Sequence, residues 1–180
     1  MGTLLLLLLA MGLSLLSVQG AKRPLMTPAG AEELLGTWHI IRWAGDLPMP
    51  AKTQTQPLPP LRFIRNKDTT FKLRMNFRFR SVCLPFDMHM DEFIIPGAFY
   101  SAKGYFISIH FLPGKEYAIS FYKGTTAYVY YESMELIGST LDESPDVLRT
   151  FEEYVEWKGH HKTEIIDPPE LEPCEYHREV

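Results

Sequence analysis

Several stretches of the chain alternate between apolar and polar residues, which is the pattern of a strand with two unlike faces. The clearest stretch is 71–80, FKLRMNFRFR, in which phenylalanine, leucine and methionine take every odd position and polar residues take every even one. Because successive side chains of a strand point to opposite faces, this segment has one apolar face and one cationic face. A helix would bury several of these charges, so the pattern predicts a strand.

The same alternation returns further along the chain. Residues 127–137 are also rich in tyrosine and β-branched residues, and Pro85 marks an edge strand, a bulge or the start of a strand. Short strands separated by turns with glycine or proline predict an antiparallel sandwich or barrel. The pattern alone leaves both architectures open. The alternating apolar positions are Leu84, Phe86, Met88 and Met90, then Tyr105, Ile107, Ile109 and Phe111, then Tyr117, Ile119 and Phe121.

The hydrophobic period changes after Ser144. Pro145 suits the first position of a helix, and Gly159 suits its end. We therefore predict one amphipathic helix that packs on the outside of the sheet, followed by a short strand over 163–166. The apolar stripe at helical spacing consists of Val147, Leu148, Phe151, Tyr154, Val155 and Trp157.

The N-terminus predicts a secreted, extracellular protein. An almost unbroken apolar run covers residues 4–18, and small residues precede a cleavage site after Gly20. The run is shorter than the roughly 20 apolar residues that cross a bilayer, although a retained anchor is the alternative. We expect a signal peptide over 1–20 and a single domain over 21–180.

Cysteines and charge add two further expectations. Cys83 and Cys174 are the two cysteines, and in a secreted protein they are expected to form one disulfide; two free thiols are the alternative. The net charge is −4, with +4 on residues 22–141 and −8 on residues 142–180. These two surfaces either pair with one another or are both solvated, and we favour solvation.

An ordered set of motifs resembles the lipocalin family. Gly36-Thr37-Trp38 resembles the family's G-x-W signature. The segments LPGKEYAISFYKG at 112–124 and ELIGSTLDESPDVLRTFEEYVEWKG at 135–159 resemble the tear lipocalin and odorant-binding branch. The resemblance covers essentially the whole mature chain. It departs at Ser139, where many members carry an arginine that packs over the G-x-W tryptophan.

The resemblance implies an all-β fold, an eight-stranded antiparallel up-and-down barrel (calyx) with one C-terminal α-helix packed on the outside. It implies closure of the barrel near Trp38 and a disulfide between Cys83 and Cys174, which lie at the family's cysteine positions. The implied function is a secreted binder or carrier of small hydrophobic molecules, such as an odorant or lipid, and not an enzyme.

The resemblance makes the apolar faces of the strands the wall of a ligand site. The alternative is that these side chains pack on one another as a core. Tyr105 or Tyr117 would offer a hydroxyl to the ligand, and the expected inward positions hold no lysine or arginine to pair with a carboxylate. Phe71 belongs to the same wall, and the predicted ligand-binding residues are Trp38, Leu73, Met75, Phe77, Phe79, Phe86, Met88, Met90, Tyr105, Ile107, Ile109, Tyr117, Ile119 and Phe121.

Other chemistry finds little support in the sequence. There is no phosphate-binding or dinucleotide-binding glycine motif, no G-x-S-x-G and no H-E-x-x-H, so we expect no cofactor and no catalytic residue. Asp87, His89 and Asp91 share one strand face and could bind a metal, but a solvated face is the favoured interpretation, and we expect no metal.

The expected partners are a small hydrophobic ligand and, as a possibility, a cell-surface receptor, with the protein a monomer or weak dimer. The cationic face of 71–80 favours an alternative function, an interaction protein that docks on a receptor or partner protein. Secretion and net acidity argue against nucleic acid. The cationic face of 71–80, called the basic stripe below, consists of Lys72, Arg74, Arg78 and Arg80.

Overall fold

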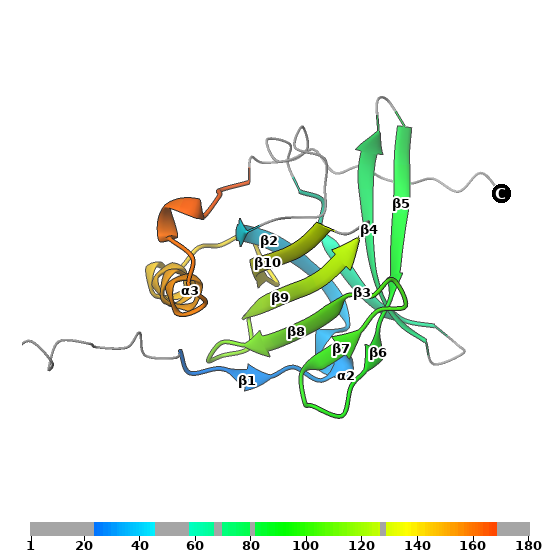
Figure 1. The fold of residues 1–180 in the computed structure, drawn as a ribbon, viewed down its shortest axis with the longest axis horizontal. Coiled ribbons are helices and arrows are strands. Elements are labelled where there is room, and N and C mark those ends of the chain that lie inside the picture. Colours follow the sequence, from blue (N-terminus) through cyan, green and yellow to red (C-terminus); the bar gives the residue numbers. More distant parts are fainter. Residues whose placement is uncertain (1–23, 46–57, 67–69, 80–81, 127–128, 169–180) are drawn as a thin grey trace, which may run out of the picture.

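The computed structural model describes residues 24–45, 58–66, 70–79, 82–126 and 129–168. A sheet of antiparallel strands curls into a nearly closed barrel, and one helix lies outside it (Figure 1). The strands run in the order β5-β4-β3-β2-β10-β9-β8-β7-β6, and β1 pairs with β8 off this path. The predicted antiparallel barrel with a C-terminal helix is therefore confirmed.

The strand bounds follow the predicted alternation closely. They are β1 Thr27–Pro28, β2 Gly36–Gly45, β3 Leu61–Arg65, β4 Phe71–Phe79, β5 Val82–His89, β6 Asp91–Glu92, β7 Ala98–Tyr100, β8 Phe106–Phe111, β9 Tyr117–Thr126 and β10 Val129–Gly138.

The nine strands on the path correspond to the eight that were expected. A single residue, Met90, separates β5 from β6, so these two elements form one bent strand. Its first part pairs with β4, and its second part pairs with β7. The bend at Met90, which is 2% exposed, thereby joins the two ends of the sheet and brings the barrel close to closure.

A bulge in β2 sets which side chains face the interior. The register between β10 and β2 shifts so that Leu136 opposes Arg42 whereas Ile137 opposes Ile40, which leaves Ile41 as the extra residue. A bulge changes the inside–outside alternation of a strand beyond it. Consequently Trp38 and Trp43, five residues apart, both belong to the interior cluster.

Helix α3, Pro145–Trp157, covers the outer face of the sheet as predicted. Its buried residues Phe151, Tyr154 and Val155 pack with Ile41 and Leu136 in an apolar layer between helix and strands. The protein thus has an apolar cluster inside the barrel and a second apolar layer outside it, beneath the helix. The predicted strand at 163–166 is wrong: Lys162–Glu164 is a 3₁₀ helix, η3, and Ile166 makes an isolated bridge with Trp43.

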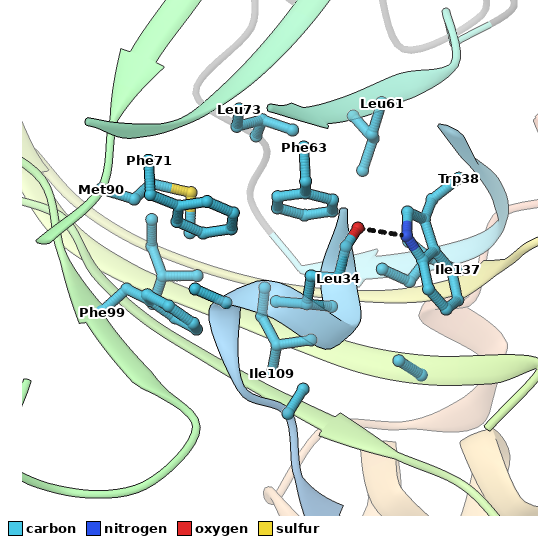
Figure 2. Close-up of a cluster of buried hydrophobic side chains, with 14 of the residues drawn as sticks. Leu34, Trp38, Leu61, Phe63, Phe71, Leu73, Met90, Phe99, Ile109 and Ile137 are labelled. Atoms are coloured by element: carbon cyan, nitrogen blue, oxygen red, sulfur yellow. Dashed lines mark hydrogen bonds between the residues drawn. The ribbon is translucent and has the colours of Figure 1, made fainter. Parts of the chain in front are cut away.

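One end of the barrel is closed by a short helix, α2, Ala31–Leu34. The indole Nε1 of Trp38 donates a 2.8 Å hydrogen bond to the carbonyl oxygen of Leu34, shown as the dashed line in Figure 2. The Trp38 ring lies 5.9 Å from that of Phe111. The expected closure near Trp38 is therefore present, and Ser139, in place of the family's arginine, donates its backbone N–H to the carbonyl of Glu116.

In the described part of the chain, no helix has the length and apolar character needed to cross a bilayer.

Candidate functional site

The inward faces of β2, β3, β4, β5, β7 and β8 are lined by large apolar side chains. Figure 2 shows Phe63, Phe71, Leu73, Phe99 and Ile109 converging on the interior from these strands. The Phe63 and Phe71 rings stack at 5.8 Å, and the Phe71 and Phe99 rings are 5.5 Å apart. These rings pack on one another in one buried apolar cluster, which also contains Trp38 at the closed end.

Most of the predicted ligand-binding residues do lie on this inward surface. Met75, Phe86 and Tyr105 are partly buried and pack against it. Tyr105 lies over Gly124 of β9, where a β-carbon would approach its ring to 2.5 Å. Contact with a ligand stays a prediction for all of them. The predicted residues that are buried in this cluster are Trp38, Leu73, Met88, Met90, Ile107 and Ile109.

The face of β9 that was predicted to point inward points outward. Ile119 and Phe121 are buried beneath α3 with Phe151, and Tyr117 packs against the same layer. The ammonium of Lys158 lies 3.6 Å from the centre of the Phe121 ring, and the Tyr117 hydroxyl donates to the backbone oxygen of Asp142. The outer face of β9 is apolar because the helix covers it, so apolar alternation did not identify the inner face.

Two other predicted ligand-binding residues have side chains outside the described ones. Phe77 and Phe79 belong to β4, but the description of this strand's side chains stops at Asn76. Cys83 lies on β5, and Cys174 lies outside the described residues. The disulfide therefore stays a prediction.

The inward face of β9 and β10 carries a polar cluster that sequence reasoning missed. It consists of Ser120 and Tyr122 on β9 with Ser133 and Glu135 on β10. Ser120 directly opposes Glu135, and Tyr122 directly opposes Ser133. The Ser120 hydroxyl donates to Oε2 of Glu135 at 3.1 Å. Ser120, Ser133 and Glu135 are 0%, 1% and 5% exposed.

Burial changes the acidity of this cluster. Removal from water disfavours the carboxylate and raises the pKa of Glu135 from 4.5 to about 7, against the opposing effect of the Ser120 hydrogen bond. Burial and the neighbouring charge of Glu135 raise the pKa of Tyr122 well above 10. The Tyr122 hydroxyl thus lies close to the Glu135 carboxyl, in a contact that acts to lower the pKa of Glu135 but falls short of normal hydrogen-bond geometry.

The alternation in the sequence contains this cluster, but it was interpreted with the inner and outer faces exchanged. The strand 117–122, YAISFY, has its smaller and more polar residues at Ala118 and Ser120. Because Tyr117, Ile119 and Phe121 were predicted to face inward, these two positions were left for the outer face. Trp43, which opposes Glu135 across β10 and β2, was missed because the bulge changes the alternation within β2.

The basic stripe on β4 is partly neutralised on the barrel's outer surface. Arg74 donates to both carboxylate oxygens of Asp87 at 2.6 and 2.7 Å, and Lys72 donates to the same group at 3.0 Å. The Arg74 guanidinium holds the pKa of Asp87 well below its usual range. Lys72 is 9% exposed, so the expectation of a fully solvated stripe is wrong for this residue. The side chains of Arg78 and Arg80 lie outside the described ones.

Asp87, which was considered above as a metal ligand, has its carboxylate paired with Arg74 and Lys72. Across the described residues, no group of three or more histidine, cysteine, aspartate or glutamate side chains is arranged to hold a metal ion.

Comparisons with known proteins support the fold. No family model matches the sequence, and no curated protein matches it either. Solved structures do match, among them one described by the words "The Siderocalin Ex-FABP functions through dual ligand specificities". It has a TM-score of 0.68 at 14% sequence identity, covering 79% of this chain and 97% of that chain. At this identity the likeness shows the fold alone, a lipocalin-like barrel, and does not resolve the branch.

Proposed function

We propose that this protein is a secreted carrier that binds a small hydrophobic molecule inside its barrel. The observation that carries the proposal is the lipocalin-like barrel with an apolar inward face and one end closed by Trp38 and α2. The interior of an eight-stranded barrel is either filled by its own side chains or holds one small ligand, and the proposal takes the second alternative. The matched siderocalin, described as functioning through ligand specificities, supports binding as the role of such a barrel.

Removal of residues 1–20 and a Cys83–Cys174 disulfide are part of the same proposal. Secreted proteins fold in an oxidising compartment, where two cysteines in one chain favour a bridge. We further propose a monomer or weak dimer. The mass of the protein recovered from culture medium, before and after alkylation without reductant, tests the cleavage and the bridge; two alkylated cysteines in the folded protein would contradict the bridge.

A neutral fluorescent probe, N-phenyl-1-naphthylamine, tests the proposed binding. The wild type is expected to bind it with a Kd of about 1 µM, which corresponds to about −8 kcal/mol. Replacing Met75 with glutamate should weaken binding at least about tenfold, because Met75 packs against the inward apolar cluster and the new carboxylate has no partner there.

The matched control is Asn76→Glu, at the next residue of β4, whose side chain points to the opposite face. Both positions are partly buried, so neither substitution removes a fully buried side chain. Circular dichroism confirms that each variant is folded. Equal loss of probe binding in the two variants, or greater loss in Asn76→Glu, would contradict an interior site.

A further inference from the structure

The polar cluster of Ser120, Tyr122, Ser133 and Glu135 lies in an otherwise apolar interior. The four side chains lie at the corners of a rectangle on two neighbouring strands, because Ser120 opposes Glu135 and Tyr122 opposes Ser133. Directly opposed side chains on one face have β-carbons about 5 Å apart, and residues i and i+2 on one strand are about 7 Å apart. A single polar atom of a ligand can therefore lie within hydrogen-bond distance of more than one of these four side chains.

Two members of the cluster have unused hydrogen-bonding capacity. Among the described residues, the buried Ser133 hydroxyl has no hydrogen-bond partner, and the buried Tyr122 hydroxyl has only a contact with Ser120 and Glu135 that falls short of normal hydrogen-bond geometry. Leaving such a group unpaired costs about 1–3 kcal/mol, so proteins seldom bury one without a function or a bound molecule. These hydroxyls and Glu135 therefore mark a place where a polar group is missing.

The surroundings of the cluster are apolar. Glu135 opposes Trp43 on β2, and Ser120 and Tyr122 oppose Ile109 and Ile107 on β8. Ser133 opposes Gly45, a glycine with φ of 87° that brings no side chain. A ligand at this place would contact hydrocarbon over most of its surface and meet polar atoms at one point.

The chemistry of the cluster selects among polar groups. A carboxylate would be repelled by an ionised Glu135, and an ammonium would lose the large hydration energy of an ion on burial. A hydrocarbon would leave the Ser133 hydroxyl unpaired. A hydroxyl is neutral, donates one hydrogen bond to Glu135 and accepts others from Tyr122 or Ser133.

We propose that this cluster is the polar end of the ligand site and that the ligand is an apolar molecule carrying a hydroxyl group. The inference rests on the proposed carrier function and adds the class of ligand to it. The apolar part of the molecule lies along the inward surface near Ile107 and Ile109. Its hydroxyl lies between β9 and β10.

Displacement of bound N-phenyl-1-naphthylamine by four eight-carbon compounds tests the proposal. At pH 8, 1-octanol is expected to displace the probe at a concentration about tenfold or more below that of octane, sodium octanoate or octylamine. The Glu135→Leu variant, whose own Kd for the probe is measured first, should lose the preference for octanol over octane. Tyr122→Phe and Ser133→Ala remove single hydroxyls and should each reduce that preference severalfold.

The outcomes separate this inference from the carrier function. Intact probe binding with equal displacement by octanol and octane would overturn the hydroxyl proposal alone, and would mean that water satisfies the cluster. Octanoate or octylamine as the strongest competitor would overturn the ligand class. Absence of probe binding in the folded wild type would overturn the carrier function and this inference with it.

Discussion

Replacing Phe151 with alanine is expected to lower the free energy of unfolding by about 3–5 kcal/mol, a typical cost of removing a buried phenylalanine ring. Phe151 is 1% exposed and packs in the layer between α3 and the outer faces of β2, β9 and β10. The cost follows from lost burial and from the cavity left in a layer that cannot fully collapse. Urea unfolding followed by circular dichroism measures the change.

The matched control is Glu153→Ala, an exposed position on the same helix, which should change the free energy of unfolding by less than about 0.5 kcal/mol. Probe binding by folded Phe151→Ala should stay close to that of the wild type, because Phe151 lies outside the barrel. A change of under 1 kcal/mol in Phe151→Ala would mean that the helix does not cover the sheet as described.

The second large effect is a fall in stability with rising pH that depends on Glu135. Burial raises the pKa of this carboxyl from 4.5 to about 7, so between these values the folded protein binds a proton that the unfolded chain releases. Its contribution is fully present below pH 4.5 and is lost as pH rises through 7. The expected loss is about 3 kcal/mol, from about 1.4 kcal/mol per pKa unit.

Glu135→Gln should remove this decline, since glutamine does not titrate. The groups that face Glu135 are Ser120 and Tyr122 on β9, Trp43 on β2 and Ser133 on its own strand. The pKa of Tyr122 is raised well above 10, so it does not titrate in this range. The control is Glu153→Gln, an exposed carboxyl on α3, which should keep the decline. An unchanged profile in Glu135→Gln would show that the carboxyl is solvated.

Much of the fold could be predicted because its elements depend on local patterns. Alternation in 71–79 predicted β4, and the stripe after Ser144 predicted α3 with both ends correct. Closure into a barrel could not be derived from alternation, because it depends on the bend of β5 into β6 at Met90. That expectation came from the resemblance, and the structure agrees with it.

The candidate site was less predictable, for two physical reasons. Alternation identifies two faces of a strand without saying which is inside, and an outer face covered by a helix is as apolar as an inner one. Tyr117, Ile119 and Phe121 were assigned to the wrong face for this reason. The second reason is the bulge at Ile41, which shifts the alternation of β2 and brings Trp43 inside.

Glu135 could not be found from sequence for a related reason. A carboxylate on a strand is ordinarily assigned to solvent, because burying it costs free energy. The strand partner Ser120 and the raised pKa reduce that cost, and both depend on contacts between residues 15 positions apart.

The central claim is that the ligand lies inside the barrel, and isoleucine methyl groups report on it most directly. In the protein labelled at isoleucine δ1 methyls, nuclear Overhauser contacts from bound N-phenyl-1-naphthylamine should reach Ile107 and Ile109 on the inward surface. They should be absent from Ile41 and Ile119, which lie beneath α3. Contacts confined to Ile41 and Ile119, or to the exposed Ile94 and Ile95, would contradict the account.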